Sequence, residues 1–276
     1  MIVAAGEALV DCFPRRRGFV ARSGGAPYNW ARGLVRAGAE AGFSGVLGRD
    51  AFGRRLRRGL AADGVAFLGR FSDAPTPIAL VAGGSFRFYH RGTALEEPVD
   101  LPPARAYLLG SLALQLGRVV PPESGFLALD PNVRPGLTPP AFREAFARWA
   151  ERAHLVKLSR EDARWLGGDP YAYARALARR GPAVVLTLGR EGAVGFVAGR
   201  RLAVPAVPAR ERDPTGAGDA FFAALVARLD ALAGLGEAAP EPDPLLEAMR
   251  FAARVAAATV ARLGALPPVS RRLPRA

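Results

Sequence analysis

Hydrophobic positions along the chain form short, continuous apolar runs that alternate with longer stretches where apolar residues recur every three or four positions. The runs are typical of strands covered on both faces, and the stretches of amphipathic helices. The pattern predicts strands over residues 2–5, 78–82, 106–109, 126–130, 154–158, 183–188 and 193–197. It predicts helices over residues 26–37, 51–63, 140–152, 160–166, 171–180, 217–229 and 245–263. This alternation favours a layered α/β fold.

Two segments break the alternation. Residues 10–23 are too charged and too few for a helical crossover, and residues 85–90 alternate like a half-exposed strand. Together they predict a small β-flap over the open edge of the main sheet. We expect one domain over 1–276, with a lid from about 10–23 and 76–95. An exposed lid strand offers an edge on which a second copy could pair as a homodimer.

Composition bounds the location of the protein. Half of the 276 residues are hydrophobic, yet none of the apolar runs reaches the roughly 18 residues of a membrane span. The first residues have no basic region before their apolar stretch, so we expect no signal peptide. Cys12 is the single cysteine, which fits a reducing cytoplasm.

The net charge of +13 raises the question of a nucleic-acid partner. The arginines are spread along the chain, and no basic stretch is interleaved with aromatic residues for base stacking. Lys157 is the one lysine, so a coding bias towards arginine explains the charge more simply. We expect no nucleic-acid or membrane partner, although the positive field suits anionic nucleotides.

The segment Asp-Pro-Thr-Gly-Ala-Gly-Asp at 213–219 carries the clearest chemistry. An apolar run without a helix breaker follows it, so Gly216, Ala217 and Gly218 should begin a helix. The first N–H groups of a helix lack internal acceptors and bind anions. Asp219 then lies in the first turn, within reach of a bound phosphate. Phosphoryl transfer to a hydroxyl needs this combination of donors and a base.

The same segment fits other local structures less well or equally simply. It could be an ordinary capped helix start, with Asp213 or Thr215 as the N-cap. A dinucleotide fingerprint would need a third glycine where Phe221 stands, and a Walker A loop would need Gly-Lys-Ser or Gly-Lys-Thr.

Further polar groups follow the predicted strands, where parallel sheets bind ligands. Asp11 and Asn29 could hydrogen-bond sugar hydroxyls, and Gly24 and Gly25 let a ligand touch the backbone. The alternative at the glycines is a tight turn that feeds a helix.

Three more strand ends carry polar residues. Asp130 and Asn132, which we group with the substrate site, precede Arg134; the alternative is an Asx turn with a surface arginine. Ser159 and Asp162 resemble a capping box, which does not exclude an outer-shell metal role. A last strand end, with Thr187, Gly189 and Gly192, could admit a nucleotide or form a plain hairpin turn.

Taken in order, these motifs resemble the ribokinase-like (PfkB) carbohydrate kinase family. The most specific segments are Gly-Gly-Ala-Pro-Tyr-Asn at 24–29 with Gly-Arg-Asp-Ala-Phe-Gly at 48–53, and the segment at 213–219. The resemblance implies a three-layer α/β/α fold with a mostly parallel sheet and a β-lid. It also implies ATP and Mg²⁺ as cofactors.

The resemblance implies roles by position. Asp219 would be the catalytic base, and the amides of Gly216, Ala217 and Gly218 would hold the transferring charge. Asp11, Gly24, Gly25 and Asn29 would contact the sugar. The nucleotide site would include Lys157, Thr187, Gly189, Gly192, Thr215, Gly218, Ala253, Ala256 and Ala257. Ser159 and Asp162 stand where the family has Asn and Glu near magnesium, and Asp213 and Thr215 match positions that bind a monovalent cation such as K⁺ in some members.

Within the family, segments 6–11, 24–27 and 156–159 look most like fructokinases, which implies fructose 6-phosphate as the product. The lid segment 93–95, Thr-Ala-Leu, departs from the fructokinase pattern Ser-Ala-Asp. Alternatives are a ribokinase-type activity or a 2-keto-3-deoxygluconate kinase activity. In the second case, Arg91 and Arg134 could bind the carboxylate of the substrate. A catalytically silent, sugar-responsive regulatory protein is the alternative of another class.

Overall fold

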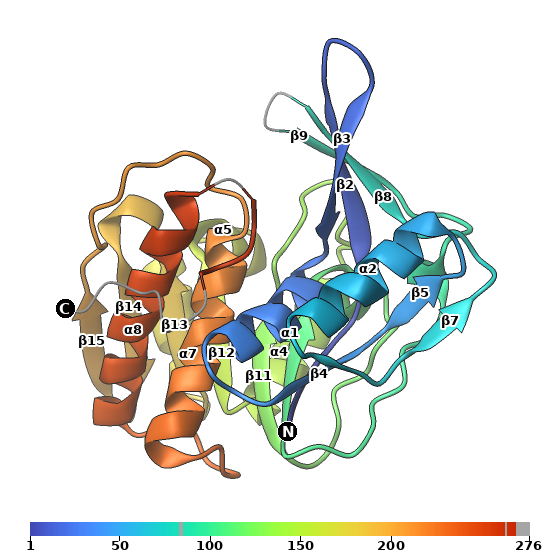
Figure 1. The fold of residues 1–276 in the computed structure, drawn as a ribbon. Coiled ribbons are helices and arrows are strands. Elements are labelled where there is room, and N and C mark those ends of the chain that lie inside the picture. The colour runs from blue at the N-terminus through green and yellow to red at the C-terminus, as the bar shows by residue number, and fades with distance from the viewer. Residues whose placement is uncertain (83–84, 263, 269–276) are drawn as a thin grey trace.

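The computed structural model describes residues 1–82, 85–262 and 264–268. In this part of the chain, a nine-stranded sheet forms the centre of the molecule (Figure 1). Its strands lie in the order β15 (Arg200–Val204), β14 (Ala193–Val197), β13 (Ala183–Thr187), β12 (Leu155–Ser159), β11 (Phe126–Asp130), β10 (Ala106–Gly110), β1 (Ile2–Ala5), β4 (Ala41–Ser44) and β6 (Ala66–Phe67). All pairs are parallel except β13 with β14 and β14 with β15.

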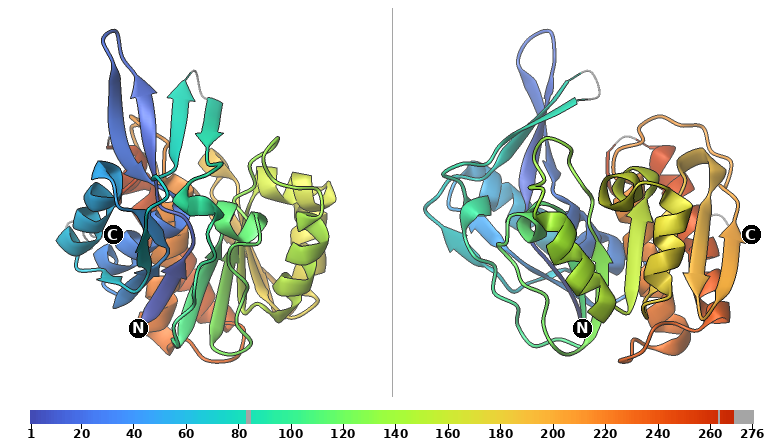
Figure 2. Two further views of the ribbon diagram at one scale, coloured as in Figure 1. Left: turned by 90° about the vertical axis from the view of Figure 1, so that its right-hand side faces the viewer. Right: turned by 180° about the vertical axis from the view of Figure 1, so that it is seen from behind.

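Helices cover both faces of this sheet, because its strands are apolar on both sides (Figure 2). In β1, Ile2 and Ala4 pack into one core cluster and Val3 and Ala5 into the other. The first cluster includes α1 (Ala26–Arg36), α2 (Ala51–Ala62), α7 (Ala217–Ala233) and α8 (Pro242–Val260). The second includes α3 (Ser111–Gln115), α4 (Phe142–Arg152), α5 (Arg160–Gly167) and α6 (Pro170–Ala178). The result is a three-layer α/β/α arrangement, as the sequence predicts.

A second sheet, which we call the lid, rises from one end of this body (Figures 1 and 2). Its strands lie in the order β3 (Phe19–Gly24), β2 (Leu9–Pro14), β8 (Ile78–Ala82) and β9 (Ser85–Tyr89). Asp11 pairs with Arg22 across β2 and β3, so their side chains share one face of the lid. The outer strands β3 and β9 carry exposed Phe19 and Tyr89. Pairing of a second copy on this edge stays a prediction.

The Gly-Arg-Asp-Ala-Phe-Gly segment links the lid to the body. Asp50 caps α2 by accepting the N–H of Gly53, and it also accepts the backbone N–H and the hydroxyl of Thr76, just before β8. Burial raises the pKa of Asp50, but these hydrogen bonds lower it by a larger amount. The pKa of Asp50 is therefore below its usual value. One ionised carboxylate therefore holds a helix start and a lid strand together.

The predicted elements all occur, with bounds that shift by a few residues, and position 263 of the helix expected over 245–263 lies outside the described residues. The sequence reading missed β4, β6, β15, α3 and the parallel pair β5 (Val46–Gly48) and β7 (Arg70–Ser72). Two short 3₁₀ turns lie at η1 (Ala94–Glu96) and η2 (Gly189–Glu191). Among the described helices, none combines the length and the apolar character that crossing a membrane requires.

Candidate active site

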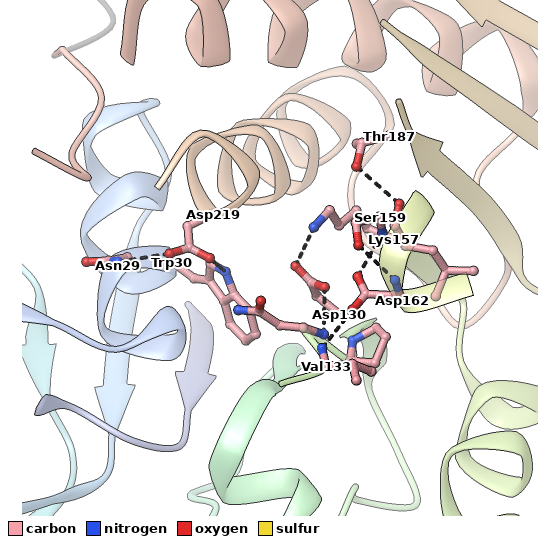
Figure 3. A network of polar contacts seen from close by, with 12 residues as sticks. Asn29, Trp30, Asp130, Val133, Lys157, Ser159, Asp162, Thr187 and Asp219 are labelled. Atoms are coloured by element: carbon pink, nitrogen blue, oxygen red, sulfur yellow. Dashed lines mark hydrogen bonds and ion pairs between the residues drawn. The ribbon is translucent and has the colours of Figure 1, made fainter. Parts of the chain in front are cut away.

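Asp219 lies in the first turn of α7, where two side chains of α1 hold it (Figure 3). The Asn29 amide nitrogen donates to its Oδ2 at 2.9 Å, and the Trp30 indole N–H donates to its Oδ1 at 3.2 Å. The helices approach closely because Gly33 of α1 faces Ala223 of α7. A Cβ at Gly33 would lie only 2.7 Å from that of Ala223. The carboxylate is thus fixed by a helix crossing rather than by a loop.

The environment of Asp219 suits a base. Burial raises the pKa of Asp219, and the hydrogen bond from Asn29 and the charge of Lys157 offset only part of that effect. Asn29 is itself 7% exposed, and its Oδ1 has no hydrogen-bond partner among the described residues. A buried amide oxygen without a donor leaves an acceptor for a ligand hydroxyl.

A cavity of about 380 Å³ opens beside this carboxylate, between the lid and the body. Its size is within the range of small-molecule sites. The lid supplies Leu9, Asp11, Val81, Phe86 and Phe88. The body supplies Glu7, Gly25, Ala26, Asn29, Ser111, Leu112, Arg134, Pro214, Thr215, Gly216 and Asp219. Asp11, Gly25, Asn29, Thr215, Gly216 and Asp219, which the sequence singles out, therefore meet at one cavity.

Asp11 reaches the cavity from the lid. Gly24, two residues after the cross-strand partner Arg22 in β3, leaves room for Asp11, because a Cβ at Gly24 would lie 2.2 Å from the Asp11 Oδ2. Burial and the nearby Asp219 raise the pKa of Asp11 to about 6, against the opposing charges of Arg134 and Arg22. Arg134 lies under the lid residue Phe86, with its guanidinium 5.9 Å from the ring centre. Three acidic side chains, Glu7, Asp11 and Asp219, and one guanidinium, that of Arg134, therefore line the cavity.

Residues 213–216, which we call the entry loop, lead into α7. Gly216 adopts φ 77°, and a Cβ there would lie 2.5 Å from the Cα of Ala265, so only glycine fits. Asp213 accepts the N–H of Thr215 at 3.0 Å and of Gly264 at 2.9 Å. Burial raises the pKa of Asp213, but these bonds and Arg22 bring it below its usual value.

Lys157 lies beneath the first turn of α7, where a Cβ at Gly218 would be 3.4 Å from its Nζ. It donates to Asp130 at 2.9 Å, and both side chains are almost fully buried. Burial lowers the pKa of Lys157, but Asp130, Asp162 and Asp219 raise it more, so the ammonium keeps its proton. Neither Lys157 nor Asp130 lines the cavity.

Asp162 has a structural role in this network (Figure 3). It forms a capping box with Ser159, and its Oδ1 accepts the N–H of Val133 at 2.7 Å. Asp130 accepts the N–H of Asn132 in an Asx turn at 3.2 Å. Each Asp162 oxygen keeps a free lone pair, so contact with a metal through water remains open. In the described chain no group of three His, Cys, Asp or Glu residues is arranged to hold a metal, and the metal assignments stay predictions.

Six of the predicted nucleotide residues, those on β13, at the η2 turn and on α8, lie outside the cavity. Thr187 ends β13 beside Ser159 and donates to the Leu158 carbonyl at 3.2 Å. Gly189 and Gly192 flank the η2 turn at positive φ. Ala253, Ala256 and Ala257 lie on α8. None of these lines the cavity, and their roles stay predictions, as does that of Arg91, which is exposed after β9.

Three residues of the site were missed by sequence reasoning. Trp30 follows Asn29 directly, and adjacent helical positions do not usually face one partner. Ser111 lines the cavity at φ 53° beside Glu7, which accepts the N–H groups of Leu112 and Ala113. Phe86 could be expected on the lid from its alternating strand, but not its place over the cavity.

Comparison with known proteins gives a consistent picture. The family described as "pfkB family carbohydrate kinase" matches residues 1–272. A fructokinase of Rhizobium leguminosarum bv. trifolii is 32% identical over 264 residues, covering 83% of this chain and 79% of the relative.

Solved structures agree over nearly the whole chain. A double mutant of the fructokinase of Vibrio cholerae O395, with fructose, ADP and a potassium ion bound, superposes with a TM-score of 0.85 at 25% identity. The match covers 96% of this chain and 93% of that one. The aminoimidazole riboside kinase of Salmonella enterica, complexed with aminoimidazole riboside and an ATP analogue, has a TM-score of 0.85 at 26% identity, covering 98% and 97%.

Proposed function

The chain belongs to the pfkB family of carbohydrate kinases, which makes it an ATP-dependent phosphotransferase, and we propose that its acceptor is fructose and its product fructose 6-phosphate. The observation that carries this proposal is the Asp219 carboxylate, which lines a sugar-sized cavity together with Asp11 and Asn29. The fructokinases among the similar proteins support the choice of sugar.

In the proposed reaction, Asp11 and the unpartnered Oδ1 of Asn29 accept hydrogen bonds from sugar hydroxyls. The acceptor hydroxyl of the sugar gives its proton to Asp219. At the same time the hydroxyl oxygen bonds to the γ-phosphorus of ATP, and the bond between that phosphorus and the bridging oxygen breaks to release ADP. The amides of Gly216, Ala217 and Gly218 and the nearby ammonium of Lys157 stabilise the charge on the transferring group. Ala217 N–H also closes a turn to the Pro214 carbonyl at 3.3 Å.

The nucleotide would bring Mg²⁺ with its phosphates, and Mg²⁺ bound there neutralises phosphate charge. Asp130 and Asp162 lie around Lys157, beneath the first turn of α7, and their carboxylates are oxygen ligands of the type Mg²⁺ prefers. Because both already have protein partners, we assign them to water-mediated contact.

A 2-keto-3-deoxygluconate kinase activity is the second candidate, because Arg134 lines the cavity and could bind a carboxylate. The charge balance opposes it. Arg134 faces the carboxylates of Asp11 and Asp219, and Glu7 also lines the cavity, so an acidic substrate would meet three acidic side chains and one guanidinium. A neutral sugar fits this cavity better than an acid.

The test is an ADP-release assay on fructose, ribose, 2-keto-3-deoxygluconate and aminoimidazole riboside, with ³¹P NMR to locate the phosphate on the product. The proposal expects the highest kcat/KM for fructose and a 6-phosphate. A higher kcat/KM for another acceptor would overturn the choice of fructose. Silence on every acceptor, with sugar binding retained, would favour a regulatory protein over an enzyme.

A further inference from the structure

An ion pair joins the lid to the entry loop. Arg22 of β3 contacts the Oδ2 of Asp213 at 3.1 Å through its Nη1, although the residues are 191 positions apart in the sequence. The side chains are 30% and 15% exposed, so water screens the pair only in part. No other described residue of the lid forms an ion pair with the body.

Arg22 is held in position for this contact. Its guanidinium lies 5.0 Å from the centre of the Phe13 ring, an attractive arrangement of a cation and an aromatic face. The preceding carbonyl, of Ala21, accepts a hydrogen bond at 3.0 Å from Arg55 of α2. Lid strand β3 is thus anchored on α2 while Arg22 reaches the entry loop.

The Asp213 carboxylate already accepts three hydrogen bonds, two of them on Oδ2. Its Oδ1 accepts the Thr215 N–H, and its Oδ2 accepts both the Gly264 N–H and the Arg22 guanidinium. The resemblance assigns Asp213 and Thr215 to a monovalent-cation site, and one similar fructokinase structure contains potassium. A potassium ion on Oδ2 would stand next to a guanidinium of the same charge, and the two would repel each other. On either oxygen of Asp213, the charge of Arg22 therefore opposes the binding of a second cation.

We propose that Arg22 supplies, from the lid, the positive charge that balances Asp213, so that the entry loop is ordered without a monovalent cation. Asp213 fixes Thr215, and Thr215 and Gly216 both line the cavity ahead of Asp219. Arg22 shares the face of the lid that presents Asp11 to the cavity. Arg22 is therefore a positioning residue. Its strand, β3, pairs with β2, which presents the sugar contact Asp11. Its guanidinium holds the entry loop, which precedes the base Asp219. This inference rests on the proposed kinase site but not on the identity of the sugar.

The experiment compares the wild type with Arg22→Ala and Arg22→Lys, with Arg16→Ala as the control from the exposed hairpin of the same lid. Each protein is measured in potassium chloride and in tetramethylammonium chloride at equal ionic strength. The readouts are kcat with ATP and the best acceptor, and the thermal midpoint of the protein without ligands. The midpoint does not depend on which sugar is the substrate, so a wrong sugar and a wrong role for Arg22 give different results.

We expect the wild type and Arg16→Ala to change less than about twofold in kcat between the two salts. Arg22→Ala should lose about tenfold in kcat, equal to about 1.4 kcal/mol, and potassium should restore part of that loss and raise its midpoint. Arg22→Lys should keep most of the activity in both salts. A merely structural role of Arg22 would not give a rescue that is specific to potassium.

Two results would overturn the proposal. One is a wild-type protein whose kcat depends on potassium, or whose thermal midpoint without ligands is raised by potassium. This result counts even if Arg22→Ala fails to fold. The other is an Arg22→Ala protein that matches Arg16→Ala in both salts.

Discussion

Asp219 receives two N–H donors from α1, and the proposed reaction requires it to be a carboxylate that accepts a proton. Asp219→Asn keeps the shape but removes the proton acceptor. We expect kcat to fall by roughly 10² to 10⁴, the usual contribution of a general base, while KM for ATP changes little. Steady-state kinetics on the best acceptor measures both.

Asp230→Asn, at the other end of α7, is the matched control, because Asp230 pairs with Arg105 at the surface and such pairs contribute little. Turnover of Asp219→Asn near that of the control would refute the assignment of the base.

Asp11 gives a prediction for stability as a function of pH. Its pKa is raised to about 6, so the folded state binds the proton more tightly than the unfolded state, where the carboxyl titrates near 4. Its stabilising contribution is complete below about pH 4 and is lost as the pH rises through about 6. Asp11→Asn should therefore raise the free energy of unfolding at pH 8, by at most about 3 kcal/mol, and leave it nearly unchanged at pH 4.

Urea unfolding at the two pH values measures this difference, and KM for the sugar should rise in the same variant because a contact is lost. Equal effects on stability at both pH values would contradict the raised pKa.

At the scale of elements, the crossing of α1 and α7 sets the geometry of the base. Gly33→Val places a branched side chain against Ala223, where even a Cβ is 2.7 Å away, and pushes the helices apart. We expect a loss of roughly 1 to 3 kcal/mol in stability from overpacking, and a lower kcat because Asn29 and Trp30 move away from Asp219. Calorimetry and kinetics on the purified variant test this.

Gly236→Val is the control, since nothing lies within 4 Å of a Cβ there. The Gly33→Val enzyme could be less stable and still have the kcat of the control. The helix crossing would then stabilise the fold without setting the position of Asp219.

The sequence predicted the elements with strong periodicity and missed those fixed by their neighbours. β4 reads Ala-Gly-Phe-Ser, which has no strand signal alone, but parallel pairing with β1 and β6 completes it. The edge strand β15 begins with two exposed arginines. In the site, Asp219 and Asn29 follow from local motifs. Arg22 does not, because its partner Asp213 comes near it only through the fold.

For the whole molecule, the net charge of +13 has a kinetic consequence. A positive field attracts ATP, and salt screens that attraction as the Debye length falls from about 30 Å at 0.01 M to about 3 Å at 1 M. We expect kcat/KM for ATP to fall several-fold as tetramethylammonium chloride is raised across this range. KM for a neutral sugar should stay nearly constant, and it is the internal control. A kcat/KM for ATP that does not vary with salt would refute steering by the whole charge.

The buried position of Lys157 allows its accessibility to be measured by chemical labelling of the native protein. Lys157 is the one lysine of the sequence, so acylating reagents have only two amine targets, its Nζ and the α-amino group of Met1. The Nζ is enclosed under α7, and modification there requires the site to open, whereas the terminal amine reacts at any time. We therefore expect the mass of the intact protein after brief labelling to report how often Lys157 becomes accessible, and a bound nucleotide to slow the addition at Lys157.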